Sequence, residues 1–353
     1  AISLKPDYAE AYNNMGIAFQ DQGKLEKAVD AYNKAVSLKP TYKDAVKNLV
    51  KLPAGRLNSK LFTLCKSFDF VLSYTSEKSE QVFFQANLLK HQGQIERSFE
   101  KFCEANKMKS EEIKNYTSKD FEENIENLER IQRWIPRDQK IGDLGLTKIF
   151  LFGPSRSGKS LLECLLNESF TLLPLREGIK MDSFSKIQLE NKYPYTALFD
   201  SLFFRSEDEL RSYGYDIVTS TAPESIFYSD YLFDFLPNTY FINIERDPLD
   251  VASEIFTKEY NYGNFYSYDR DKITKYLDLY YELYDILISK IPDQCITINY
   301  KAIVKNPNKT VEMISQFISK DLKKINLQEF TKSVPSESIF RNYFKQNSTK
   351  YNE

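Results

Sequence analysis

The sequence predicts two structural classes in one chain: an all-α half, followed by an α/β half built on a P-loop-type parallel sheet flanked by helices. The hexapeptide at residues 1–6 recurs with small changes at residues 35–40, which is a spacing of 34 residues. From residue 148 onward, short apolar segments typical of buried strands alternate with segments of helical periodicity. Alternation of this kind is typical of a parallel sheet with helices on both faces.

In the first repeat, small residues occur at the positions where two antiparallel helices would contact each other. Ala28 lies opposite Gly16 in this arrangement, and Pro6 and Pro40 separate one helix pair from the next. Both the period and these positions resemble the tetratricopeptide repeat. A single repeat cannot bury its own apolar face, so we expect neighbouring helices to complete it. The resemblance implies a docking surface for a protein partner.

A more degenerate repeat follows the first one. Apolar residues at helical spacing occur over residues 83–105, and Gly93 lies 70 residues after Gly23, which is close to two periods. Residues 121–134 predict one more helix, which Pro136 ends. A plain helical bundle is the alternative for this half. We predict a helical domain at 1–137 and an α/β domain at 138–353.

Composition excludes several classes of function. The net charge of -2 gives no general attraction to nucleic acid or to an anionic membrane, and no apolar run reaches the roughly 18 residues of a membrane span. The only histidine is His91, so a multi-histidine metal site is excluded, and the four dispersed cysteines predict reduced core thiols. The sequence starts inside a repeat, without a secretory segment. We expect a cytoplasmic protein whose sequence continues upstream.

The strongest local pattern is a strand, a glycine loop and a helix start at residues 148–162. A loop of this form holds phosphate, because backbone N–H groups converge at a helix N-terminus and basic side chains add charge. Read literally, the loop fits the G-x-x-x-x-G-K-S pattern of nucleoside-triphosphate sites. The residues predicted to hold phosphate are Gly153, Ser155, Arg156, Ser157, Gly158, Lys159 and Ser160.

Further strands are predicted at residues 171–175, 215–220, 240–245 and 295–300. Ligands of parallel sheets bind at the carboxyl ends of the strands. We therefore expect the glycine loop, Glu177, residues 220–221 and Arg246 to surround one cleft.

Residues 240–250 resemble the second anion-binding element of sulfotransferases, in which a strand is followed by an arginine and by a helix that Asp-Pro opens. The glycine loop resembles the first element of that family, G-x-P-R-S-G-T-T, with Arg156, Ser157 and Gly158 kept. The whole layout is similar to the bacterial subfamily that carries tetratricopeptide repeats ahead of a sulfotransferase domain.

This resemblance implies a donor and a set of roles. The donor would be 3′-phosphoadenosine 5′-phosphosulfate, with no metal. The glycine loop would hold its 5′ end, and Arg246 its 3′-phosphate, since a guanidinium binds phosphate through two parallel hydrogen bonds. Glu177 would accept the proton of the acceptor hydroxyl. The other predicted nucleotide contacts are Tyr300, Arg341 and Ser253, which lies next to the position of a family serine.

Three positions depart from the family pattern. Thr221 stands where the family has a lysine, and Lys159 stands where it has a threonine, so Lys159 is predicted to supply the missing charge in catalysis. Glu254 stands where the family has a serine, with Ser253 beside it. The closing loop at residues 338–343 lacks the family's glycine.

Three functions remain open from the sequence. The first is sulfuryl transfer to a tyrosyl, phenolic or sugar hydroxyl. The second is a catalytically degenerate protein that serves as an interaction scaffold. The third is a P-loop NTPase or kinase that uses Lys159 and Ser160, for which Asp200 is the candidate magnesium ligand. For Glu177, a carboxylate that simply stabilises a helix N-terminus is the alternative.

Overall fold

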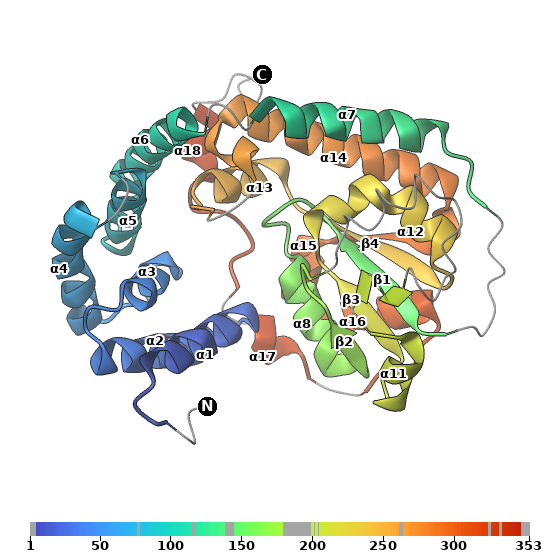
Figure 1. The fold of residues 1–353 in the computed structure, drawn as a ribbon, viewed down its shortest axis with the longest axis horizontal. Helices are drawn as coiled ribbons and strands as arrows, with labels where there is room; N and C mark the ends of the chain where they lie inside the picture. The colour runs from blue at the N-terminus through green and yellow to red at the C-terminus, as the bar shows by residue number, and fades with distance from the viewer. Residues whose placement is uncertain are drawn as a thin grey trace. The chain divides into compact units, whose positions relative to one another are not determined.

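The computed structural model describes residues 5–75, 78–113, 117–137, 145–178, 199–200, 202–203, 205–260, 264–323, 326–331 and 334–346 (Figure 1). The chain divides into two compact units. The first contains Ala1–Thr117, Ala252–Thr274 and Glu337–Glu353, and the second contains Ser118–Val251 and Lys275–Ser336. Each unit is therefore assembled from separate stretches of sequence. The predicted domain division at 137/138 stays a prediction.

The second unit is built on a five-stranded sheet in the order β2-β3-β1-β4-β5, and every strand pair in it is parallel. This confirms the predicted α/β class. The strands are β1 (Thr147–Phe152), β2 (Leu172–Pro174), β3 (Ile217–Ser220), β4 (Thr239–Glu245) and β5 (Cys295–Asn299). Because all five run the same way, their carboxyl ends meet at one edge of the sheet.

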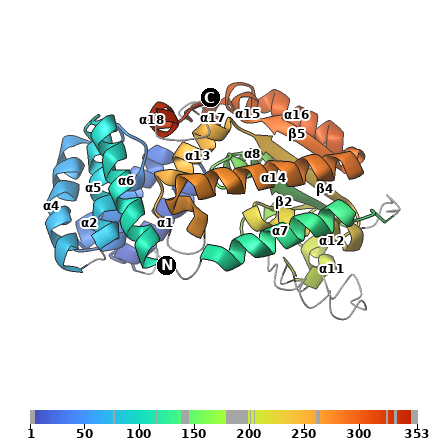
Figure 2. The same ribbon diagram turned by 90° about the horizontal axis from the view of Figure 1, so that it is seen from above.

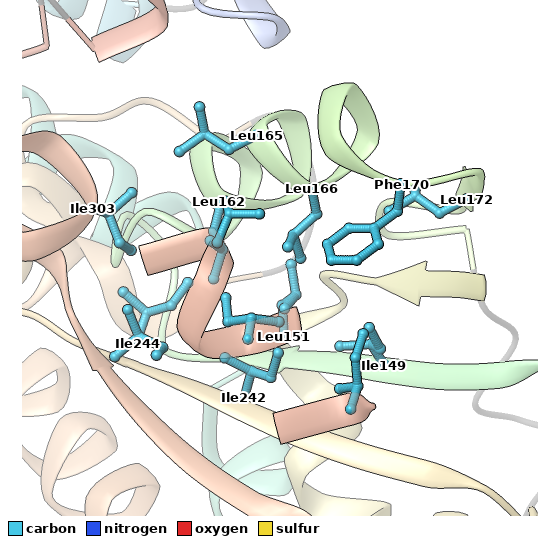
Figure 3. Packing of buried hydrophobic residues seen from close by; sticks show 14 of the residues in the cluster. Ile149, Leu151, Leu162, Leu165, Leu166, Phe170, Leu172, Ile242, Ile244 and Ile303 are labelled. Carbon is cyan, nitrogen blue, oxygen red and sulfur yellow. The ribbon is translucent and has the colours of Figure 1, made fainter. Parts of the chain in front are cut away.

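Alternate side chains of the central strands point to opposite faces, as the period of two requires. On one face, Ile149 and Leu151 of β1 and Ile242 and Ile244 of β4 pack with buried leucines of one helix (Figure 3). That helix is α8 (Lys159–Ser169). On the other face, Phe152 stacks on Phe241, with ring centroids 5.0 Å apart. The starting position of α8 is thus fixed by its packing on the sheet.

Several other helices complete the second unit. The helix α7 (Thr117–Arg133) is held by Arg130, whose Nε donates to Asp230 at 2.8 Å in α12 (Ser229–Phe235). The remaining elements are α11 (Glu207–Ser212), η1 (Pro223–Tyr228), η3 (Pro292–Gln294), α15 (Tyr300–Lys305), α16 (Pro307–Ile318) and α17 (Gln328–Thr331). The residues of α7, α13 (Pro248–Phe256) and α14 (Arg270–Lys290) are divided between the two units.

The first unit contains the predicted repeat as the helix pair α1 (Ala9–Asp21) and α2 (Leu25–Leu38). A Cβ at Gly16 would lie 2.5 Å from the ring of Tyr32, so this crossing requires glycine. Gly23 and Gly93 have similar positive φ angles, 70° and 74°, in the turns of two helix pairs. The second such pair is α5 (Lys78–His91) and α6 (Ile95–Glu112), which lie side by side (Figure 2). The helices between the pairs are α3 (Lys43–Lys51) and α4 (Ser59–Thr75).

Segments from much later in the sequence complete this helical core. Phe99 of α6 contacts Phe256 and Phe340, with ring centroids 5.7 and 6.1 Å apart. The guanidinium carbon of Arg270 lies 5.2 Å from the centroid of Phe99 and 5.7 Å from that of Phe344. These later segments add η2 (Phe265–Tyr268) and α18 (Arg341–Gln346) to the unit. The helical core is therefore not made from the repeats alone.

His91 makes the stability of the first unit sensitive to acid. Its Nε2 donates to the carbonyl of Val50 at 3.1 Å, while its Nδ1 is buried without a partner among the described residues. Burial lowers the pKa of His91 from 6.5 to about 4. Between these values the unfolded chain binds the extra proton and the folded chain does not, so stability falls as the pH falls.

We expect the chain to lose about 3 kcal/mol of stability between pH 7 and pH 4 through His91 alone. The measurement is urea unfolding followed by circular dichroism at several pH values, compared with His91→Gln, which cannot titrate. The difference between the two proteins isolates this group, since His91 is the only histidine. Equal acid sensitivity of both proteins would contradict the expectation.

Within the described residues, no helix has the length and apolar content to cross a membrane. The same residues contain no cluster of three or more His, Cys, Asp or Glu side chains arranged to hold a metal ion.

Candidate phosphate-binding and transfer site

The predicted glycine loop joins the carboxyl end of β1 to the start of α8. Gly153 and Gly158 have φ angles of 141° and 111°, and Arg156 between them has a φ of 70°. A Cβ on Gly158 would lie 2.6 Å from the ring of Tyr300, and one on Gly153 would lie 2.2 Å from the Oγ of Ser157. Glycine is thus required at both ends of the loop, for conformation and for space. The predicted succession of strand, loop and helix is confirmed.

The loop encloses a polar atom that lacks a partner. Ser157 is fully buried, and its Oγ has no hydrogen-bond partner among the described residues. Buried hydroxyls without partners are costly, because they lose their hydrogen bonds to water. This atom lies beside the N-terminus of α8, where the first backbone N–H groups have no partner within the helix. The loop therefore suits an anion that accepts several hydrogen bonds.

Lys159 is almost completely buried, with 5 % of its surface exposed. Its Nζ donates to the carbonyl of Gly153 and, at 2.9 Å, to that of Pro154. The ammonium thus ties the first residue of α8 to the first two residues of the loop. Its predicted role toward a ligand stays a prediction.

Arg246 directly follows the strand β4 and contacts two other predicted residues, Arg156 and Tyr300. Its Nη1 donates to the carbonyl of Arg156 at 2.7 Å, and its guanidinium carbon lies 4.4 Å from the ring centroid of Tyr300. Its Nε is buried without a partner among the described residues. A guanidinium has five N–H donors, so Arg246 can hold the loop and still bind an anion.

Glu177 lies in the turn that follows β2, and its side chain is exposed. The preceding residue, Arg176, has a φ of 53°. Its carbonyl accepts the backbone N–H of Thr221 at 2.8 Å and the hydroxyl of Ser220 at 3.1 Å. The turn with Glu177 and the end of β3 are thus joined, as expected from their common edge.

Sequence reasoning missed two residues of this edge. Tyr280 of α14 is fully buried, and its Oη accepts the N–H of Gly153 at 2.8 Å. Glu163 of α8 is 4 % exposed and accepts the hydroxyl of Thr219 at 2.7 Å. Burial raises the pKa of the Glu163 carboxyl. One signal for Glu163 was available, since a carboxylate at this position interrupts the apolar helix pattern of residues 161–166.

The remaining predicted positions have different surroundings. Ser253 and Glu254 of α13 and Arg341 of α18 belong to the first unit. Ser253 is fully buried, whereas Glu254 and Arg341 are partly exposed. Ser155 is partly exposed and Ser160 is exposed. Asp200, which the NTPase interpretation requires at a strand end, is an exposed helical residue.

Two protein families match this sequence. The sulfotransferase family matches residues 148–323, and the tetratricopeptide repeat matches residues 9–42. The peroxisomal targeting signal receptor of Candida albicans is 45% identical over 49 residues, which are 14% of this chain. The chain spans only 8% of the length of that receptor.

Among solved structures, the sulfotransferase domain of the Synechococcus PCC 7002 olefin synthase is similar at 13% identity and a TM-score of 0.34, covering 60% of this chain and 88% of that one. The sulfotransferase domain from the curacin biosynthetic pathway is similar at 13% identity and a TM-score of 0.33, covering 60% and 89%. Mouse sulfotransferase SULT7A1, solved in complex with PAP, is similar at 14% identity and a TM-score of 0.29, covering 64% and 73%. These structural similarities are weak, so the assignment depends on the two sequence matches. Through residues 148–323 the chain belongs to the sulfotransferase family, and it carries a tetratricopeptide repeat at residues 9–42.

Proposed function

We propose that the second unit transfers a sulfuryl group from 3′-phosphoadenosine 5′-phosphosulfate to an acceptor hydroxyl. The observation that supports this most is the glycine loop in a segment of sulfotransferase sequence, with a buried Ser157 hydroxyl that no other described residue binds. An NTPase would also need a carboxylate at a strand end to hold magnesium. Asp200 lies in a helix instead, which disfavours that function.

The loop residues have distinct roles in this proposal. The backbone N–H groups at the start of α8 and the hydroxyls of Ser157 and Ser160 bind the 5′-phosphosulfate. Arg246 binds the 3′-phosphate with the N–H groups that it does not use on Arg156. The guanidinium of Arg246 lies over the ring of Tyr300, at the 4.4 Å spacing of a cation–π contact. Ser253 and Arg341 stay candidates for further nucleotide contacts.

In the transfer step, Glu177 accepts the proton of the acceptor hydroxyl while the acceptor oxygen bonds to sulfur. The bond from sulfur to the bridging oxygen of the donor breaks, and its electron pair leaves with adenosine 3′,5′-bisphosphate. The ammonium of Lys159 offsets the negative charge that develops there. A general base must be accessible to the acceptor from solvent, and the side chain of Glu177 is exposed.

Replacing Glu177 by glutamine removes the proton acceptor but keeps the size of the side chain. We expect kcat to fall roughly a hundredfold with unchanged donor affinity, because general base catalysis contributes about that much. The measurement is transfer from labelled donor to a panel of phenolic, sugar and tyrosyl-peptide acceptors. Glu312→Gln, at an exposed position of α16, is the matched control. Equal kcat for Glu177→Gln and the unmutated protein would remove Glu177 from the mechanism.

A titration separates this function from the alternatives. We expect adenosine 3′,5′-bisphosphate to bind, and ATP to bind no better with Mg²⁺ than without it. Magnesium-dependent ATP binding would favour the NTPase. If neither nucleotide binds and no acceptor is sulfated, the interaction scaffold becomes the better interpretation.

The match at residues 9–42 supports a second, compatible role, since tetratricopeptide repeats present surfaces to other proteins. We propose that the repeat docks a protein partner or a protein acceptor. A cytoplasmic location is likewise a proposal.

A further inference from the structure

A buried carboxylate that the proposed mechanism does not use lies behind the candidate site. Glu163 is 4 % exposed and sits one turn after Lys159 in α8, among the leucines that pack on the sheet. Carboxylates are rarely buried unless their oxygens accept hydrogen bonds, because burial removes their hydration. The partners of Glu163 therefore indicate what the residue does.

Both partners of Glu163 belong to the edge that carries Glu177. The hydroxyl of Thr219, in β3, donates to Oε1 at 2.7 Å. The backbone N–H of Arg176 lies near the same carboxylate and lowers its pKa. Burial raises the pKa of this carboxyl, and the Thr219 hydroxyl and the Arg176 N–H oppose the effect. One side chain of α8 thus reaches both a strand and the turn beside it.

The turn is fixed on its other side by β3 and the residues after it. Leu175 donates its N–H to the carbonyl of Thr219 at 2.9 Å. The carbonyl of Arg176 accepts the N–H of Thr221 at 2.8 Å. Glu163 lies near the N–H of Arg176, so both backbone polar groups of Arg176 have a polar neighbour, although its φ of 53° is unfavourable for a residue with a side chain. Glu177 is the next residue, so these contacts of Arg176 also fix the position of the Glu177 backbone.

We propose that Glu163 is a positioning residue, which holds the turn bearing Glu177 at a fixed place relative to the helix that starts at the glycine loop. The inference rests on the proposed function, in which Glu177 is the base and the loop binds the donor. A single side chain then sets the spacing between the proton acceptor and the donor site. Small errors in that spacing are costly for catalysis.

Substitution of Glu163 by methionine or by glutamine distinguishes the hydrogen-bonding role of this side chain from its packing role. A methionine has the length of glutamate but cannot accept the Arg176 N–H, so the turn loses one hydrogen bond while the packing is kept. A glutamine can accept that N–H through its oxygen and donate its own N–H to the Thr219 hydroxyl, which also serves as an acceptor. Glu163→Gln should therefore preserve the turn and Glu163→Met should loosen it.

The first test is amide hydrogen exchange, which needs no activity. In Glu163→Met we expect the Arg176 amide to exchange about tenfold faster than in the unmutated protein, because one hydrogen bond is lost. Global stability in urea should stay equal or rise, since removing a buried carboxylate is often neutral or stabilising. Glu163→Gln and Glu168→Gln, a control on the same helix, should exchange normally. Glu163→Leu serves as a second apolar variant if Glu163→Met does not fold.

The second test is the split between kcat and the donor KM. We expect kcat to fall roughly tenfold in Glu163→Met with an unchanged donor KM, and to recover in Glu163→Gln. The inference would be overturned if the Arg176 amide exchanged at an unchanged rate in a folded apolar variant. It would also be overturned if Glu163→Gln lowered kcat as much as Glu163→Met does. Absence of transfer by the unmutated protein would count against the proposed function instead, and the exchange result would still decide the role of Glu163.

Discussion

Replacing Lys159 by threonine should lower the rate of sulfuryl transfer at least about tenfold, because one electrostatic contact to developing charge is worth a few kcal/mol. Lys159 occupies a position where the family has threonine, while Thr221 occupies the position of the family's lysine. Adding Thr221→Lys to the Lys159→Thr variant should restore part of the rate. The measurement is turnover with labelled donor for the single and the double variant.

The structure adds a second consequence of the same change. The Nζ of Lys159 holds the carbonyls of Gly153 and Pro154, so its loss should also loosen the loop. A contact made only in the transition state lowers kcat, whereas a loosened loop weakens donor binding as well. Calorimetry with adenosine 3′,5′-bisphosphate separates these effects, and Lys305→Thr at an exposed position is the control. A variant with unchanged kcat and unchanged affinity would show that Lys159 serves neither purpose.

Replacing Arg246 by alanine should strongly reduce the affinity for the 3′-phosphorylated nucleotide. A hydrogen bond to a charged group is worth about 1.5–3 kcal/mol, which corresponds to a loss of affinity of tenfold to more than a hundredfold. The effect should lie at the upper end of this range, because Arg246 also holds the carbonyl of Arg156 at 2.7 Å. Adenosine 5′-monophosphate, which lacks the 3′-phosphate, should lose much less affinity than adenosine 3′,5′-bisphosphate.

Arg246→Lys separates the effect of the positive charge from the effect of the guanidinium geometry. Lysine keeps the charge but lacks the planar fork that can bond Arg156 and an anion together. We expect intermediate affinity in Arg246→Lys and unchanged affinity in the control Arg205→Ala, which replaces an exposed arginine. Equal calorimetric affinity of Arg246→Ala and the unmutated protein for the bisphosphate would refute the assignment.

Local patterns in the sequence predicted the parts of the site that a short segment determines. The glycine loop combines a strand, two glycines and a helix start within 15 residues, so its local structure followed from the residues themselves. The position of Arg246 after a strand was predicted for the same reason, since a strand end and Asp-Pro flank it. The meeting of these segments followed from the common edge of a parallel sheet.

Contacts between distant residues could not be predicted in this way. Tyr280 reaches Gly153 across 127 residues of sequence, and no local pattern specifies that pairing. Glu163 was visible as an interruption in an apolar helix, but its partners depend on how β3 and the turn after β2 are placed. The direction of the Lys159 side chain was equally hidden, because its flexible stem allows the ammonium to bind either a ligand or the loop.

The aromatic core of the first unit has a consequence for synthesis of the chain on the ribosome. Phe99 packs on Phe340, and these two rings are separated by roughly 240 residues of sequence. At about 5–20 residues per second, translation needs roughly 12–48 seconds to supply the later ring. During that interval the nascent helical unit exposes apolar surface that its own sequence does not yet cover. Early folding of the nascent chain is therefore incomplete, and binding by chaperones should be strongest before residue 340 emerges.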